Sequence, residues 1–199
     1  MKTLIVCYSL TANNLTLAAA LQKRLDADLL RLETTRPLTR FSIYMAMLFN
    51  RLPKLKPYSV NISQYNRVIL IAPVWGGQIA KPLKSFLTAE RSNLESYSYI
   101  TVCGGLAGQR ANLERELAQC AKKEPDCVTE LWVSDLIKRR GDIRQMLQYR
   151  LTESDLLLFE EKIQKFISKA APNEDTHLSS SPVISNLSRS ADASHVVMS

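Results

Sequence analysis

Residues 3–21 read TLIVCYSLTANNLTLAAAL, and this stretch sets the expected architecture of the chain. Residues 3–8 form an apolar run typical of a buried strand, and residues 13–25 have the apolar spacing of a helix. Between them, residues 9–14 (SLTANN) offer hydroxyl and amide groups but neither glycine nor proline. A strand that passes through a polar turn directly into a helix is the first half of a βαβ unit.

The same alternation continues along the chain. Further strands are predicted at 28–33, 67–73, 98–103 and 127–133, and further helices at 80–92 and, after a capping-box pattern at Thr152 and Asp155, up to about Lys169. Continuous apolar runs are typical of parallel strands that are covered by helices on both faces. With right-handed crossovers, this order predicts an α/β fold, a three-layer α/β/α sandwich with a five-stranded, doubly wound parallel sheet.

Composition limits the number of domains and the chemistry. With 199 residues, 46% of them hydrophobic, we expect one domain over residues 1–169. Residues 170–199 are serine-rich without periodicity, so a disordered tail is expected there. No apolar run approaches the roughly 18–20 residues of a membrane span, and a cytoplasmic protein is expected. Because the two histidines lie in the tail and the four cysteines are scattered, neither a metal site nor a catalytic residue is predicted.

Residues 36–57 occupy the place of the second helix and allow two interpretations. They carry Phe41, Tyr44, Met45 and Phe49 between proline-marked ends. The preferred interpretation is an amphipathic helix packed on the sheet. The alternative is a partly exposed, methionine-rich lid or a partner-binding surface, since soft side chains repack around different shapes.

Three loops are expected to form a ligand site. In open α/β sheets, ligands bind beyond the carboxyl ends of the strands, which places residues 9–14, 74–79 and 104–109 together. The first loop suits a phosphate, because hydroxyls and amides there precede the free N–H groups of a helix start, although simple N-capping also explains it. The second and third loops hold five of the six glycines. This clustering favours a ligand.

These loops resemble those of a known family. IVCYSLTANN, APVWGG and TVCGGLAG, in this order, look like the three cofactor loops of flavodoxin and the flavodoxin-like FMN-binding oxidoreductases, over roughly residues 1–168. The resemblance implies FMN as cofactor, with Trp75 stacked on the isoalloxazine ring and the peptide of Gly76 able to hydrogen-bond the flavin N5. It assigns the phosphate to Ser9, Leu10, Thr11, Ala12, Asn13 and Asn14, and the ring to Pro73, Val74, Trp75, Gly76, Gly77, Gly104, Gly105 and Gly108.

The chain departs from the family pattern at three positions. Cys7 stands where the family usually has an aromatic residue, Ala12 where it has glycine, and Asn14 where it has a phosphate-binding threonine. Alanine is tolerated if its dihedral angles stay in the ordinary region, and asparagine can still donate a hydrogen bond to an oxyanion.

The net charge of the chain limits the classes of binding partner that are expected. The formal charge is +7, and it becomes +8 for residues 1–168 because the remainder holds two basic and three acidic residues. Flavodoxins that shuttle electrons are typically acidic, so this chain favours an acidic redox partner protein, an anionic membrane surface or an anionic substrate. Nucleic acid is disfavoured, because the basic residues are dispersed.

Two functional hypotheses follow. The first is an FMN-binding electron-transfer protein or small flavin-dependent oxidoreductase, serving a protein partner or a small-molecule electron acceptor, with NAD(P)H as a possible donor. The second is a non-catalytic partner-binding protein on a flavodoxin scaffold that has lost its flavin.

Overall fold

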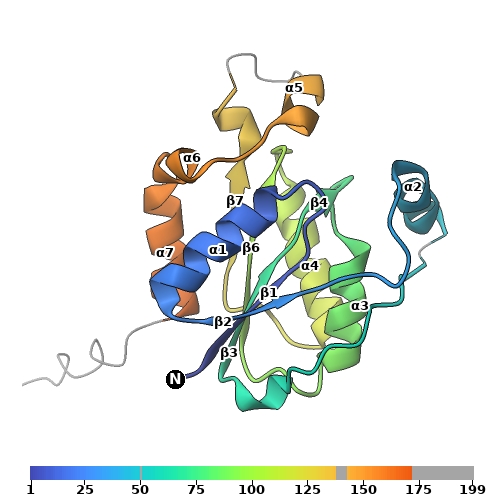
Figure 1. Ribbon diagram of the computed structural model, residues 1–199, viewed down its shortest axis with the longest axis vertical. Helices are drawn as coiled ribbons and strands as arrows, with labels where there is room; N and C mark the ends of the chain where they lie inside the picture. The colour runs from blue at the N-terminus through green and yellow to red at the C-terminus, as the bar shows by residue number, and fades with distance from the viewer. Residues whose placement is uncertain (50, 138–142, 172–199) are drawn as a thin grey trace, which may run out of the picture.

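A five-stranded parallel sheet forms the centre of the computed structural model, which describes residues 1–49, 51–137 and 143–171. Its strands are β1 (Thr3–Cys7), β2 (Asp28–Arg31), β3 (Arg67–Ile71), β6 (Tyr97–Cys103) and β7 (Val128–Trp132), in the order β2-β1-β3-β6-β7 (Figure 1). All five predicted strands are therefore present, in the strand order of flavodoxin-like sheets. The tail expected to be disordered lies, from residue 172 onward, outside the described residues.

The register of the sheet explains its two hydrophobic cores. In β1, Leu4 and Val6 point into one core while Ile5 and Cys7 point into the other, as the alternation of a strand requires. Ile5 pairs with Leu29 on one side and with Ile69 on the other. Each strand of the sheet interior therefore buries side chains on both faces, which is why these strands read as unbroken apolar runs.

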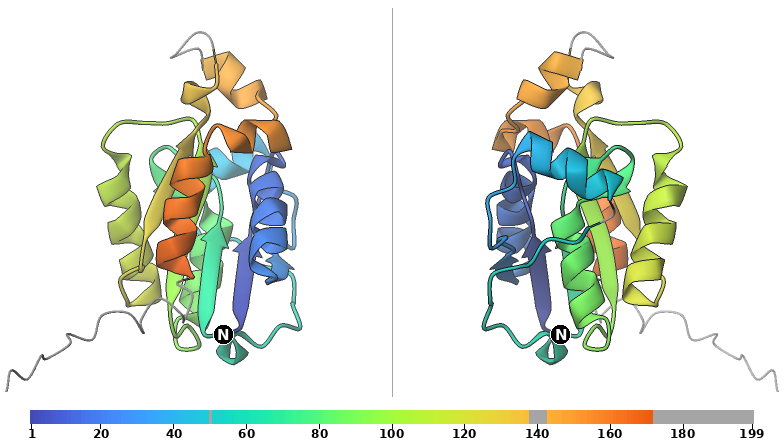
Figure 2. Two further views of the ribbon diagram at one scale, coloured as in Figure 1. Left: turned by 90° about the vertical axis from the view of Figure 1, so that its left-hand side faces the viewer. Right: turned by 90° about the vertical axis from the view of Figure 1, so that its right-hand side faces the viewer.

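Helices cover both faces of the sheet, as Figure 2 shows. On one face lie α1 (Asn13–Leu25), α6 (Glu153–Leu157) and α7 (Glu160–Ala170), and on the other lie α3 (Lys81–Glu90) and α4 (Gln109–Ala121). This arrangement confirms the predicted three-layer sandwich.

The last predicted helix is divided in two. Thr152 forms the predicted capping box, since its Oγ1 accepts from the Asp155 N–H at 3.2 Å and its own N–H donates to Asp155 Oδ2 at 2.8 Å. Helix α6 ends at Leu157, and α7 begins at Glu160. The break leaves the side chains of Leu157 and Leu158 exposed.

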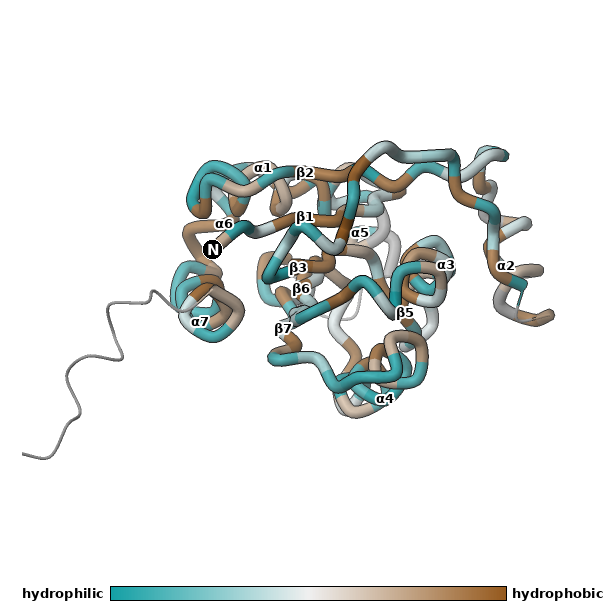
Figure 3. The backbone as a smooth tube through the Cα atoms, turned by 90° about the horizontal axis from the view of Figure 1, so that it is seen from below, coloured by the Kyte–Doolittle hydropathy of each residue, from teal (hydrophilic) through white to brown (hydrophobic). Residues whose placement is uncertain are grey.

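The segment 36–57 differs from its preferred interpretation. Among its described residues only α2 (Arg40–Leu48) is helical, and α2 does not pack on the sheet, because Phe41, Tyr44 and Leu48 are exposed. Figures 1 and 3 show α2 at the periphery of the molecule, apart from the strands. The flanking residues Leu38 and Leu55 are the ones that pack against the core.

The sequence prediction missed several short elements, which lie at the carboxyl edge of the sheet except for the 3-10 turn Ile62–Gln64, which precedes β3 at the amino edge. They are the hairpin of β4 (Val74–Trp75) and β5 (Gln78–Ile79), the helix α5 (Ile143–Gln148), and two 3-10 turns at Ile62–Gln64 and Val133–Asp135. In the part of the chain that the structure describes, no helix combines the length and apolar character needed to cross a bilayer.

Candidate functional site

The three predicted loops meet around one cavity of about 420 Å³ at the carboxyl ends of β1, β3 and β6. This volume falls within the range of roughly 300–1,000 Å³ that is typical of small-molecule sites. From the predicted set, the cavity is lined by Leu10, Thr11, Asn13, Pro73, Val74, Trp75, Gly76 and Gly104. The sequence prediction missed Ile43 of α2, Val133 and Met146 of α5, which complete an apolar wall.

The first loop contains features of an anion site. Ser9 Oγ is buried and has no hydrogen-bond partner among the described residues. Thr16 N–H donates to the Ala12 carbonyl at 2.9 Å, so the N–H groups of residues 13–15 lie within the opening turn of α1, where helical N–H groups lack an intrahelical acceptor. A buried hydroxyl beside free N–H groups at a helix start is an arrangement that accepts a phosphate.

Ala12 reaches this turn through a left-handed backbone conformation. Its φ and ψ are 69° and −17°, outside the ordinary region that the sequence argument required for an alanine. The position therefore keeps the backbone of the family's glycine while carrying a Cβ atom, and the conformation is strained.

The amides of Asn13 and Asn14 are engaged by the protein backbone. Asn13 Nδ2 donates to the Tyr149 carbonyl at 3.0 Å, and its Oδ1 accepts from the Leu151 N–H at 3.0 Å. Asn14 makes the same pair of bonds with Val102, at 3.1 and 2.9 Å. Both side chains are buried and cross-link distant segments. Their amide groups therefore form hydrogen bonds with the protein backbone, whereas the sequence prediction assigned them to a phosphate.

The second loop is a tight hairpin that carries Trp75 into the cavity. Gly76 and Gly77 both have positive φ, 56° and 77°, which a two-residue turn of type I′ requires. The half-buried Trp75 ring meets the edge of Tyr8 at 6.0 Å between centroids and 85° between planes. Gly77 itself does not line the cavity; it completes the turn.

Helix α4 holds this hairpin from behind. Asn112 Nδ2 donates to the Gly77 carbonyl at 2.8 Å, and one turn later Glu116 Oε2 accepts from the Ile79 N–H at 2.9 Å. Glu116 is in turn paired with Lys84 at 2.6 Å, with both side chains almost buried. No sequence motif signals these contacts, because they join residues that are about 35 positions apart.

In the third loop, the backbone conformation and close packing require glycine. Gly105 has a φ of 86°, and a Cβ there would lie 2.8 Å from both the Trp132 ring and Ser134 Oγ. Gly108, with a φ of 78°, begins α4. Only Gly104 of the three lines the cavity, so most of the glycine clustering reflects turns and close packing instead of ligand contact.

Titratable groups near the cavity stay neutral at pH 7. Cys103 has the one titratable side chain among the described residues that line it, and burial, followed by the nearby Glu130 carboxylate, raises the pKa of this thiol to about 12. Burial also raises the pKa of Tyr8, which lies behind Trp75, to about 12. The described residues that line the cavity therefore offer packing and hydrogen bonds and no charged side chain.

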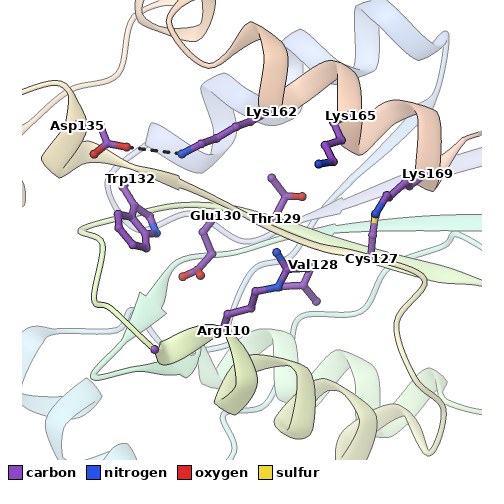
Figure 4. A pocket seen from close by; sticks show the side chains of 11 residues that line it. Arg110, Cys127, Val128, Thr129, Glu130, Trp132, Asp135, Lys162, Lys165 and Lys169 are labelled. Carbon is purple, nitrogen blue, oxygen red and sulfur yellow. Dashed lines mark ion pairs between the residues drawn. The ribbon is translucent and has the colours of Figure 1, made fainter.

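A second cavity, of about 500 Å³, lies at the outer edge strand β7 and is shown in Figure 4. Arg110, Lys162 and Lys165 approach it from α4 and α7, and Lys162 pairs with Asp135 at 3.6 Å. Gly108 lines this cavity. It therefore borders the third loop, but it shares no lining residue with the 420 Å³ cavity and does not include Trp75.

Comparisons with known proteins bear on the fold and on the family of the chain. No curated protein matches the sequence. Among solved structures, a flavoprotein from Lactobacillus acidophilus NCFM in complex with FMN is similar at 16% identity and a TM-score of 0.58, covering 65% of this chain and 92% of that one. The apo form of the flavoprotein from the same organism is similar at 17% identity and a TM-score of 0.54, covering 65% and 91%.

At these identities the two structures support the fold alone. The family model described as a flavodoxin domain matches residues 50–177, more than half of the chain, including the second and third loops. The chain therefore belongs to the flavodoxin domain family.

Proposed function

We propose that the chain binds FMN in the 420 Å³ cavity and serves as an electron-transfer protein or a small flavin-dependent oxidoreductase. The observation that carries the proposal is the meeting of three separate loops at one cavity, which Thr11 lines from the first loop and Trp75 from the second. Ser9, whose buried hydroxyl has no partner among the described residues, belongs to the same first loop but does not itself line the cavity. FMN supplies the transfer of hydride or single electrons when bound. The family membership and the FMN complex of the L. acidophilus flavoprotein support the same cofactor.

The residues would divide the work between the two ends of the cofactor. Ser9 Oγ and the N–H groups that open α1 would bind the phosphate, in place of the amides of Asn13 and Asn14. Trp75 would stack on the ring system, and the apolar wall would exclude water from it. Asn112 would act as a positioning residue, because it fixes the carbonyl of the turn that carries Trp75.

The first test is a titration of FMN with the full-length chain, followed by quenching of flavin fluorescence. The chain has two tryptophans, which gives a matched pair of variants: Trp75→Ala in the cavity and Trp132→Ala outside it. Stacking on an aromatic ring contributes roughly 1–3 kcal/mol, so Trp75→Ala should raise the Kd about tenfold or more. A wild-type chain that takes up no FMN, or an equal effect of Trp132→Ala, contradicts the proposal.

A comparison of FMN with riboflavin tests which residues bind the phosphate. Ser9→Ala removes the unpartnered hydroxyl, and a hydrogen bond to a charged group contributes about 1.5–3 kcal/mol. The substitution should weaken FMN binding roughly 10- to 150-fold and leave the binding of riboflavin, which lacks the phosphate, unchanged. Equal losses for both ligands would place the phosphate elsewhere.

The alternative function, a partner-binding protein without flavin, has specific observations in its favour. Ala12 is strained, the Asn14 amide is already engaged, and α2 presents an exposed apolar face. A chain that stays colourless after incubation with FMN and binds a protein partner would support it. If FMN does bind, oxidation of NAD(P)H by the loaded protein distinguishes a reductase from a carrier.

A further inference from the structure

Helix α2 lies in a segment of the chain whose two ends are joined to each other by backbone hydrogen bonds. Thr34 and Leu55 form an antiparallel bridge, the Thr35 N–H donates to the Lys54 carbonyl at 2.9 Å, and the Lys56 N–H donates to the Glu33 carbonyl at 2.8 Å. In the part of the segment that follows α2, the Pro53 carbonyl accepts a hydrogen bond from Ser85 Oγ of α3 at 2.7 Å. The paired ends of the segment are therefore attached to the rest of the domain, so α2 protrudes from it at a fixed position.

One side of this protrusion is apolar and uncovered. Phe41, Tyr44 and Leu48 follow the helical spacing i, i+3, i+7, and their exposed fractions are 73%, 62% and 64%. Phe49 continues the surface with 59% exposure. We call these four residues the α2 face, and Figure 3 shows the apolar segments of α2 at the outer side of the molecule. Large apolar side chains grouped in this way mark an interaction surface.

The segment that carries the α2 face holds charges of one sign. Residues 36–57 contain five basic residues, Arg36, Arg40, Arg51, Lys54 and Lys56, and no acidic residue. Arg36, Arg51 and Lys54 are exposed. Lys56 is paired with Glu33, which lies outside this range. Aromatic and aliphatic side chains on a short helix, flanked by cations, are the combination by which amphipathic segments bind anionic lipid surfaces.

We infer that the α2 face docks the protein on the surface of an anionic lipid bilayer. A helix that protrudes from the protein can enter the interface between lipid headgroups and acyl chains, whereas binding of a peptide ligand needs a groove. In addition, the net charge of +7 attracts the protein to anionic lipid. Ile43, on the same helix, lines the 420 Å³ cavity, so a bilayer bound at α2 lies beside that cavity. The docking does not depend on the proposed flavin function.

The test is co-sedimentation of the full-length chain with vesicles. Vesicles of phosphatidylcholine alone are compared with vesicles of phosphatidylcholine mixed with phosphatidylglycerol, at low and high salt. We expect binding to the mixed vesicles alone, weakening as salt rises. Each cation near an anionic surface strengthens binding roughly fivefold, so the double variant Arg51→Gln, Lys54→Gln should lose roughly 25-fold. Phe41→Ser with Leu48→Ser should lose at least about tenfold.

Leu157→Ser with Leu158→Ser is the matched control. These leucines are as exposed as the α2 face, at 66% and 73%, but they lie among acidic residues, including Glu153 and Glu160. The control should bind mixed vesicles like the wild type. All measurements are repeated with and without added FMN, so that a failure to bind flavin is separated from a failure to bind lipid.

Three results would overturn the inference. The first is equal binding to neutral and mixed vesicles, and the second is an equal loss in the leucine control. The third is no binding to the mixed vesicles. A dimer in sedimentation velocity that Phe41→Ser with Leu48→Ser dissociates would then assign the α2 face to a second copy of the chain.

Discussion

Replacing Ala12 by glycine should stabilise the protein. Ala12 has a φ of 69° at the start of α1, where a Cβ atom costs roughly 1–2 kcal/mol. Glycine removes this strain but makes the unfolded chain more flexible, which offsets roughly 0.4–1 kcal/mol. Ala12 is exposed, so the substitution loses no buried contact, and the Thr16 N–H bond to its carbonyl remains. We expect a net gain of about 0.5–1 kcal/mol in the free energy of unfolding.

Urea unfolding followed by circular dichroism measures this gain, and thermal unfolding should show a Tm higher by about 1–4 °C. The matched control is Ala19→Gly, which makes the same chemical change in the interior of the same helix. There glycine should cost about 1 kcal/mol, because a helical φ gives it no advantage. Loss of stability in both variants would refute the assignment of a left-handed conformation to residue 12.

The other predictions concern buried hydrogen bonds, close packing and pH. Asn14→Ala should lower the free energy of unfolding by about 2–4 kcal/mol in urea, since it leaves an N–H and a carbonyl of β6 unsatisfied. Gly105→Ala should lower the Tm and change the near-ultraviolet circular dichroism of Trp132, against which the new Cβ would press. The Arg24 hydrogen bond lowers the pKa of Glu160, so its contribution is present above the usual glutamate pKa of about 4.5 and is lost as pH falls through the lowered value. Arg24→Gln should therefore be less stable than wild type at pH 7, and the difference should vanish in acid.

Each of these has its own contradicting outcome. Unchanged stability in Asn14→Ala would mean that water replaces the amide. Gly108→Ala serves as the control for Gly105→Ala, because it has a similar φ of 78° with no neighbour within 4 Å, and equal Tm losses would leave strain as the sole cause. A stability difference in Arg24→Gln that persists at low pH would assign the effect to packing of the arginine stem.

The strands were predictable because burial on both faces leaves a strong, local signal. Helix α1 was predicted with the bounds that the structure gives, 13–25. The hairpin of β4 and β5 was not, since strands of two residues are too short for any periodicity. Apolar content in 36–57 predicted a helix but could not indicate whether its apolar side meets the sheet, because that depends on where the two ends of the segment are fastened.

The site was predictable at the level of loops and less so at the level of side chains. Three polar or glycine-rich loops at strand ends meet at one cavity, as predicted from the topology. The same residue types serve other purposes, however. An asparagine at a helix start suits a phosphate and a backbone carbonyl equally well, and the partner of Asn14 is 88 positions away. Chemistry at one position could not choose between these uses.

The cross-links of Asn13 and Asn14 have a consequence for biosynthesis. The loop at residues 9–14 leaves the ribosome before Val102 and Leu151, yet its shape depends on both. Until residue 151 has emerged, the opening turn of α1 lacks the backbone groups that hold it. Completion of this loop therefore waits for residue 151, and a chain truncated before Leu151 would lack the backbone N–H that binds Asn13 Oδ1.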